Sequence, residues 1–385
     1  MSESIERFQI RIEEEVLVDL RQRLARTRWP DQNEGSGWDY GTDRAYLMEL
    51  CAYWRDKFDW RAQEARLNRF DHFRTSIEGQ PIHFIRRRSP VAGALPLVLT
   101  HGWPGSVWLF HKVIDGLADP EAQGGRAEDA FDVVCPSLPG YGFSGPTLER
   151  GWDVRRIAET WARLMERLGF TRYGAQGGDW GSLVTTQLAL VDAAHLAGIH
   201  LNMVVAGPPT GEKNPTEGLT PEELKGLADM GEYQKSGSGY AQIQGTKPQT
   251  LGYGLNDSPA GLAAWIVEKF RAWSDCDGDV ERSFTKDELL TNIMIYWVTQ
   301  TINSSERLYF ESFRSGRFSA ADAKVEVPTG CAIFPKEIIR PPRRWAEAHF
   351  DVRQWTEMPR GGHFAALEEP EALVEDIRSF FRKVR

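Results

Sequence analysis

Short apolar runs alternate with stretches of helical periodicity through the middle of this chain. Residues 95–100 (LPLVLT), 131–138 (FDVVCPSL), 172–176 (RYGAQ) and 198–205 (GIHLNMVV) have the pattern of strands, and residues 154–168 have helical spacing between two of them. Strands that alternate with helices build βαβ units, whose parallel strands lie in one sheet covered by helices. The pattern therefore predicts an α/β fold with a mostly parallel sheet.

The alternation stops after residue 206 and returns near the C-terminus. Residues 207–220 are rich in Gly, Pro and Thr, and helical patterns then continue to about residue 315 without a strand between them. Strand patterns return at 327–334 and 352–358, and a final helix is expected from about 370 to 382. This order predicts a helical cap that is inserted late in the sheet.

The N-terminal region precedes the alternating pattern. Helices are expected over 12–27 and from about 43 to 58, and the segments 70–76 and 81–87 alternate around a Glu-Gly turn as the strands of a hairpin do. The expected division of the chain is a leader segment with the first hairpin strands (1–90), a first part of the core (91–206), a helical cap (207–320) and a second part of the core (321–385).

Composition excludes several classes of function. The 385 residues are 41% hydrophobic and 26% charged, which is typical of a globular protein. The formal net charge of −9 argues against a nucleic-acid partner, because phosphate binding needs clustered positive charge. The sequence has no apolar run of ~18 residues, no signal-peptide pattern and no CxxC pair among its four cysteines. We expect a cytoplasmic protein without a membrane anchor, and the sequence leaves a homodimer open.

The stretch 174-GAQGGDWGSLVTTQLALV-191 combines the end of a strand, a glycine-rich turn and a helix. Its turn fits the G-x-nucleophile-x-G elbow of α/β-hydrolases, which holds the reactive side chain in a strained turn above the sheet. A serine usually occupies that position, whereas this chain has Asp179. An aspartate that only caps the helix N-terminus is the structural alternative. The elbow predicts that Asp179 is a nucleophile.

Two further loops fit the same plan. The turn 101-HGWPGS-106 follows a strand directly, where α/β-hydrolases place one of the two backbone N–H groups that hold an oxyanion. We assign that group to Trp103 and the other to Trp180, which follows the elbow aspartate; an ordinary Gly-Pro turn is the alternative. His363 follows a strand and a double glycine and precedes the last helix. That is the position of the base in the chain order nucleophile, acid, histidine.

Two loops can supply the acid that orients His363. The loop after 198–205 offers Asn202 and no carboxylate before Glu212, whereas the loop after the next strand has Glu337 just past its end. We therefore favour Glu337 as the acid. A solvated loop glutamate is the alternative interpretation.

An aspartate at the elbow selects a particular chemistry. A serine that attacks an alkyl carbon leaves an ether, which water does not readily cleave, whereas a carboxylate leaves an ester. Water activated by His363 can attack that ester. The oxyanion hole, which the N–H groups of Trp103 and Trp180 form, can hold the resulting oxyanion. Epoxide opening and carbon–halogen cleavage both fit. An epoxide oxygen needs a donor such as Tyr, and a halide needs N–H donors from Trp or Asn.

Several motifs together resemble the microsomal and juvenile hormone branch of the epoxide hydrolases. They are HGWPGS, GGDWGS, the FP-x-E loop and RGGHFAALEEPE, with the cap segments 237–270 and 303–312 and the N-terminal TRWPD and FDHFRTSIEGQPIHFI. The resemblance covers nearly the whole chain. It implies an α/β-hydrolase fold with a late helical cap and an N-terminal helical leader. It also implies hydrolysis of an epoxide to a vicinal diol without a cofactor or a metal.

The resemblance also implies a role for each matching residue. Asp179 is the nucleophile, Glu337 the acid and His363 the base. Tyr240 in SGYAQIQ and Tyr309 in SSERLYF are the tyrosines that bind the epoxide oxygen. The membrane-bound members of this family begin with a hydrophobic anchor, which this sequence lacks, so a different location is expected.

The residues alone select the cap tyrosines less sharply, because Tyr233, Tyr253 and Tyr296 lie in the same helical block. Fourteen tryptophans, with Trp103 and Trp180 beside the hole, suggest an aromatic pocket for a bulky apolar epoxide. We expect Trp103 to contact the substrate together with the two oxygen-binding tyrosines. A haloalkane-type dehalogenase with the same aspartate nucleophile and a non-catalytic binding module are the alternatives.

Overall fold

The computed structural model describes residues 4–316 and 324–385, and its centre is a nine-stranded sheet in the order β1-β2-β3-β5-β4-β6-β7-β8-β9. The strands from β4 to β9 pair with one another in parallel, whereas the pairs β1–β2, β2–β3 and β3–β5 are antiparallel. The strands are β1 (Glu6–Phe8), β2 (Asp71–Ile77), β3 (Gln80–Arg87), β4 (Leu95–Thr100), β5 (Phe131–Pro136), β6 (Tyr173–Gly177), β7 (Leu196–Leu201), β8 (Val325–Ile333) and β9 (Phe350–Glu357).

Helices cover both faces of the sheet and form the block between β7 and β8. They are α1 (Glu14–Ala25), α2 (Arg44–Asp56), α3 (Trp60–Leu67), α4 (Ile114–Ala118), α5 (Val154–Arg167), α6 (Trp180–Val191), α7 (Pro221–Glu232), α8 (Gly239–Thr246), α9 (Pro248–Asp257), α10 (Pro259–Trp273), α11 (Lys286–Thr299), α12 (Ile302–Ser315), α13 (Arg343–His349), α14 (Ala365–Glu368) and α15 (Pro370–Phe381).

The central strands have apolar side chains on both faces, because each face is covered by helices. Leu97 and Leu99 of β4 pack into one core cluster with Phe381 of α15, while Val98 packs into the other with Trp161 of α5. Side chains alternate between the two faces of a strand, so a continuous apolar run such as LPLVLT fills both cores. The sheet therefore gives a rigid edge from which the loops of the site extend.

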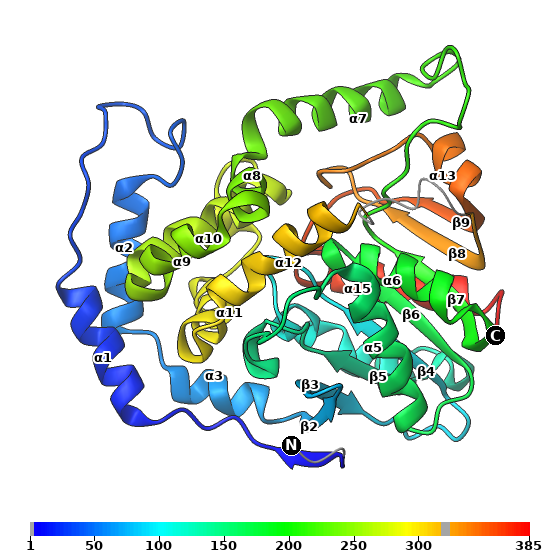
Figure 1. The fold of residues 1–385 in the computed structure, drawn as a ribbon, viewed down its shortest axis with the longest axis horizontal. Coiled ribbons are helices and arrows are strands. Elements are labelled where there is room, and N and C mark those ends of the chain that lie inside the picture. The colour runs from blue at the N-terminus through cyan, green and yellow to red at the C-terminus, as the bar shows by residue number, and fades with distance from the viewer. Residues whose placement is uncertain (1–3, 317–323) are drawn as a thin grey trace.

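The N-terminal region is joined to both the sheet and the cap. The β2–β3 hairpin extends the sheet, because Ile85 of β3 lies opposite Cys135 of β5. The segment that precedes it contacts the cap: Thr42 Oγ1 donates a hydrogen bond to the carbonyl of Ala264, and Tyr53 Oη donates to Asp287. In Figure 1 the helices α8 to α12 lie between α1 and α2 on one side and the sheet on the other.

The observed elements differ from the sequence expectations at a few places. The strand expected over 198–205 is β7, which begins at Leu196 and ends at Leu201 because its neighbour β6 ends at Gly177, directly opposite. The short elements β1, α3 and α13 were not predicted. The expected cap boundary at residues 320 and 321 lies outside the described residues. Within the described parts of the chain, helices long and apolar enough to cross a bilayer are absent.

Candidate active site

Asp179 stands in the turn between β6 and α6 in a backbone conformation that few side chains adopt. Its φ is 52° and its ψ is −132°, and only close packing around the turn can hold an aspartate there. A Cβ atom on Gly181 would lie 1.9 Å from the carbonyl oxygen of Thr100, so only glycine lets α6 approach β4 this closely. The Asp179 side chain makes no capping bond to α6. The carboxylate therefore does not act as a helix cap.

The Asp179 carboxylate instead points at the loop after β4. The backbone N–H of Trp103 donates a 2.7 Å hydrogen bond to Asp179 Oδ1. A Cβ atom on Gly102 would lie 2.1 Å from the same oxygen, so the loop needs glycine there to reach the carboxylate. Trp180 is the first residue of α6, so its N–H belongs to the positive end of that helix. One of the two predicted hole donors thus contacts the predicted nucleophile directly.

His363 and Glu337 come from the loops that follow β9 and β8. A parallel bridge between Lys336 and Gly362 keeps the two loops side by side. His363 Nδ1 lies 2.7 Å from Glu337 Oε1, and His363 Nε2 lies 3.3 Å from Asp179 Oδ2. The side chains of His363 and Glu337 are 2% and 1% exposed. The structure therefore brings three residues from separate loops, Asp179, His363 and Glu337, into one buried row.

The charges in this row set the protonation of His363. Burial disfavours the imidazolium, but the charge of Glu337 and the hydrogen bond and charge of Asp179 outweigh burial and raise the pKa of His363 to about 10. His363 is therefore an imidazolium between two carboxylates near neutral pH. In that form it can donate protons but cannot accept one.

Tyr240 and Tyr309 lie above this row among aromatic rings of the core loops and the cap. Tyr240 is stacked on Trp103 with 5.1 Å between ring centroids, and Tyr309 lies edge-on to Trp180 at 4.6 Å. The two tyrosine rings are 5.8 Å apart. Burial raises the pKa of both phenols well above the usual value near 10. Both are therefore neutral and can donate hydrogen bonds.

The other tyrosines of the cap have different places. Tyr253 is exposed on α9, and Tyr296 Oη donates a 2.6 Å hydrogen bond to the carbonyl of Gly105, which holds the loop after β4. Tyr233 Oη lies 2.9 Å from Tyr240 Oη. The sequence analysis did not select Tyr233, although its separation of seven residues from Tyr240, about two helical turns, was a signal for a shared face.

Trp273, at the end of α10, connects the cap to the base and was also missed. Its carbonyl accepts a 2.9 Å hydrogen bond from the His363 backbone N–H, and its ring lies 5.0 Å from the His363 ring.

The loop after β7, which was the other candidate to supply the acid, does not contribute a carboxylate to His363. Glu212 is ion-paired with Arg344, and Asn202 Oδ1 accepts a hydrogen bond from Gln176.

A small cavity of about 30 Å³ borders the row of catalytic candidates. Asp179, His363 and Asn202 form part of its lining, and Phe110 and Leu373 lie on its apolar side. A volume near this size is enough for one water molecule when polar partners are present. Among the described residues, no group of three or more His, Cys, Asp or Glu side chains is placed to hold a metal ion.

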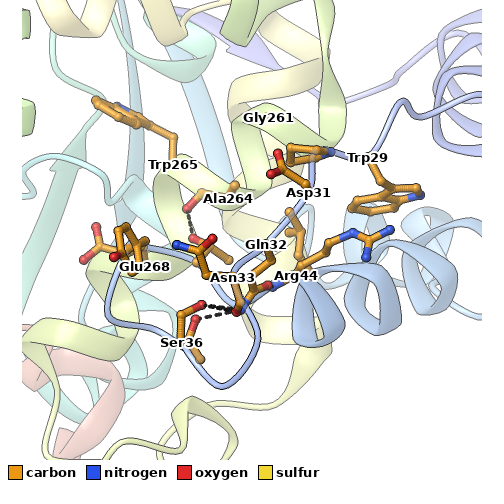
Figure 2. Close-up of a pocket in the computed structure, with 16 residues that line it drawn as sticks. Trp29, Asp31, Gln32, Asn33, Ser36, Arg44, Gly261, Ala264, Trp265 and Glu268 are labelled. Carbon is orange, nitrogen blue, oxygen red and sulfur yellow. Dashed lines mark hydrogen bonds between the residues drawn. The ribbon is translucent and has the colours of Figure 1, made fainter.

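A second, larger pocket lies on the outer side of the cap, where the N-terminal segment meets α10. Its volume is about 490 Å³. Figure 2 shows that Trp265 and Glu268 come from α10, while Trp29, Asp31 and Gln32 come from the N-terminal loop. Gln32 organises this loop, because its side chain accepts the N–H of Arg44 and donates to the carbonyl of Gly37.

Comparisons with known proteins cover nearly the whole chain. The model "Epoxide hydrolase N terminus" matches residues 5–110, and the model "alpha/beta hydrolase fold" matches residues 96–234. A putative epoxide hydrolase of Stigmatella aurantiaca is 49% identical over 98% of this chain and 85% of its own length. Epoxide hydrolase 1 of Sus scrofa is 42% identical, with 98% and 88% covered.

Solved structures agree with these sequence matches. The juvenile hormone epoxide hydrolase from the silkworm Bombyx mori superposes with a TM-score of 0.91 at 34% identity, over 99% of this chain and 96% of its own. The Aspergillus niger epoxide hydrolase has a TM-score of 0.89 at 33% identity, over 99% of this chain and 97% of its own.

Proposed function

The chain belongs to the epoxide hydrolase family, and from that premise we propose that it forms a vicinal diol through a covalent ester on Asp179. The observation that carries this proposal is the position of the Asp179 carboxylate. Its Oδ1 is held by the Trp103 N–H, and its Oδ2 faces the His363 imidazolium. A carboxylate oriented in this way has one oxygen in an oxyanion-binding position and the other available for attack.

The first half-reaction is ring opening. Asp179 Oδ2 forms a bond to one epoxide carbon, and the bond from that carbon to the ring oxygen breaks. The oxygen keeps the electron pair and takes a proton from Tyr240 or Tyr309, the two neutral phenols above Asp179. The products of this step are an alkyl ester, a hydroxyl group and a tyrosine phenolate.

Ester formation changes the protonation of His363. The charge and hydrogen bond of Asp179 contribute to the raised pKa of His363, and the ester removes that negative charge. The pKa of His363 then falls, and its proton restores the tyrosine phenolate to a phenol. His363 is thereby converted from an acid into the base that the second half-reaction requires, and the protons balance within the site.

The second half-reaction is hydrolysis of the ester. A water molecule in the 30 Å³ cavity beside Asp179 and His363 loses a proton to His363 and attacks the ester carbonyl carbon. The N–H groups of Trp103 and Trp180 hold the oxyanion on Oδ1. The bond from the carboxyl carbon to Oδ2 then breaks, and Oδ2 leaves with the diol. The leaving oxygen takes its proton from the hydroxyl group that water added, which restores the Asp179 carboxylate. Glu337 stabilises the imidazolium through its 2.7 Å contact with His363 Nδ1.

The aromatic rings around the two phenols favour a bulky apolar, preferably aromatic, epoxide as the substrate. The ring centroids of Trp103, Trp180 and Trp273 lie 4.6 to 5.3 Å from the centroid of the Tyr240 or Tyr309 ring. These rings offer apolar contact area around the two phenol donors. A haloalkane is less suited, because the paired phenols match an oxygen that stays in the product rather than a departing halide.

A single turnover in heavy-oxygen water tests the proposal. With enzyme in excess over an aryl epoxide, the new oxygen of the first diol should come from Asp179 and carry no label. Fragments containing Asp179 should gain the label instead, because solvent oxygen replaces the oxygen that left with the diol. Direct solvent label in the first diol would exclude the ester. Release of halide from a matched haloalkane at a comparable rate would favour the dehalogenase alternative.

A further inference from the structure

Lys269 is a buried cation beside one of the two proposed oxygen-binding tyrosines. It lies on α10 and is 7% exposed. Its Nζ atom lies over the ring of Tyr240, 4.7 Å from the centroid, and 5.8 Å from the centroid of the Trp273 ring. Nothing in the two half-reactions uses Lys269. A charged side chain at this depth needs compensation, which directs attention to its neighbours.

Glu268, the preceding residue of α10, provides part of that compensation. Its carboxylate is ion-paired with Lys269 Nζ. Glu268 lines the outer pocket between the cap and the N-terminal loop (Figure 2), and its side chain is 28% exposed, compared with 9% for Lys269. Solvent therefore screens the carboxylate more than it screens the ammonium. Tyr240 is in contact with the less screened member of the pair.

We propose that Lys269 is a positioning residue for ring opening, which stabilises the negative charge that Tyr240 acquires when it protonates the epoxide oxygen. The inference rests on the proposed function and goes beyond it by assigning the Tyr240 phenol a supporting cation. In ring opening, the O–H bond of Tyr240 breaks and the electron pair stays on the phenolate. A cation over the ring attracts that charge more strongly than it attracts the neutral phenol.

The surroundings of Tyr240 explain why such support matters. Its phenol hydrogen-bonds with Tyr233, lies beside Tyr309 and is close enough to the Asp179 carboxylate to be repelled when it ionises. Burial, the contact with Tyr233 and the charge of Asp179 disfavour a phenolate on Tyr240, whereas the hydrogen bond with Tyr309 favours it. A cation–π contact is strongest where water is excluded, as it is for this ring. Lys269 is thus placed to offset the burial of the negative charge that develops on Tyr240 in the transition state.

Three variants at Lys269 and Glu268 test this inference, because they should change the rate of ester formation in different directions. Lys269→Met keeps an unbranched side chain but removes the charge, and should slow single-turnover ester formation about tenfold. Lys269→Arg restores a cation and should recover most of the rate. Glu268→Gln removes the carboxylate that competes for the ammonium, so ester formation should be as fast as in the wild type or faster.

The dependence of the rate on the basicity of the leaving epoxide oxygen gives a second test. Epoxides with and without an electron-withdrawing substituent beside the ring form alkoxides of different basicity. The loss in Lys269→Met should be larger for the more basic alkoxide, because that reaction depends more on proton donation. A residue that only fills space would slow both substrates equally. Ester hydrolysis, which follows proton return to the phenol, should be unchanged in Lys269→Met.

The first measurement is made on the wild type. Intact mass spectrometry is used to detect the covalent ester on Asp179. Absence of that ester overturns the proposed function and this inference with it. If the ester forms, wild-type rates in Lys269→Met overturn the inference alone. Equal slowing in Lys269→Met and Glu268→Gln, or no recovery in Lys269→Arg, would show that the ion pair has only a packing role. If Lys269→Met does not fold, slowed ester formation in folded Glu268→Gln still overturns the inference.

Discussion

The two walls of this active site are built by different kinds of interaction. On the core wall, Asp179, His363 and Glu337 sit on loops at the sheet edge and are joined by hydrogen bonds and ion pairs of 2.7–3.3 Å. On the cap wall, Tyr240 and Tyr309 are placed by aromatic contacts of 4.6–6.0 Å between ring centroids. The polar contacts of the core wall determine the positions and charges of individual atoms. The aromatic contacts of the cap wall determine the packing of the rings and the placement of the two phenol donors.

Because the two walls are built differently, we expect mutations in them to affect the reaction differently. In the proposed mechanism, Asp179 and His363 each have a task for which no neighbour offers a substitute, so removal of either side chain should stop a particular step. The two phenols face the same place and can share one oxygen, so either should compensate partly for the other. The predictions below proceed from the largest expected effect to the smallest.

The largest effect is expected for Asp179→Ala. The variant removes the attacking oxygen, so diol formation and the covalent ester should both be abolished. Alanine keeps a Cβ at the same φ of 52°, so the backbone strain of the turn is unchanged and the protein should still fold. Product analysis and a thermal melt together check this expectation. Residual diol at a measurable rate would mean that water can open the epoxide directly.

His363→Gln should separate the two half-reactions. Attack needs only the Asp179 carboxylate, so the variant should still be alkylated, while the ester should persist for want of a base. Intact mass spectrometry should show a gain of one substrate mass, located on the peptide that contains Asp179. If the variant binds the epoxide but gains no mass, the imidazolium is needed before alkylation. Turnover at the wild-type rate would point to a different base.

Tyr240→Phe and Tyr309→Phe test the sharing of one oxygen on the cap wall. Each should slow ester formation, because loss of one donor to a developing oxyanion costs about 2.7–4 kcal/mol in comparable sites. The double variant should be nearly inactive. Tyr253→Phe is the matched control, because Tyr253 is exposed on α9 and away from these rings. Unchanged rates in both single variants would mean that other groups protonate the oxygen.

Glu337→Gln should have the smallest effect of the core changes. It weakens a charged hydrogen bond to His363 without removing the base, so ester hydrolysis should slow by about 10- to 100-fold. The loss of the Glu337 charge should also lower the pKa of His363 from about 10, which an NMR titration of the imidazole can follow. An unchanged titration would argue against Glu337 as the main source of the shift.

The raised pKa of His363 also predicts how stability depends on pH. A group that binds its proton more tightly when folded adds stability that is complete below its unfolded pKa near 6.5 and is lost as pH rises through about 10. The difference in unfolding free energy between the wild type and His363→Gln should therefore shrink between pH 6.5 and pH 10. Paired denaturant titrations at several pH values measure it.

The same contrast explains what the sequence could predict. The α/β-hydrolase fold and the resemblance to epoxide hydrolases are confirmed by the comparisons and the sheet order. The core residues follow strand ends at fixed places in the chain, so motif spacing placed Asp179, His363 and Glu337 at one edge, and their distances agree with that placement. Their chemical roles stay predictions.

The cap was harder to predict, because the spacing of residues along the sequence says little about which aromatic rings are in contact. Six helices in succession present many tyrosines and tryptophans, and which rings meet depends on how the helices cross. Tyr240 and Tyr309 came from the resemblance alone, while Tyr233, Trp273 and Lys269 were missed. The cytoplasmic location and the homodimer also stay predictions, since neither is decided by the fold.

The insertion of the cap between β7 and β8 has a consequence for how such an enzyme can diversify. The block from α7 to α12 supplies Tyr240, Tyr309 and Trp273, whereas the proposed nucleophile, acid and base all lie on loops outside it. Selection for a new substrate can therefore rewrite the cap while the reaction is preserved. The hydrogen bond from His363 to the carbonyl of Trp273 crosses that boundary, and it marks a position where exchange of cap sequence would also disturb the base.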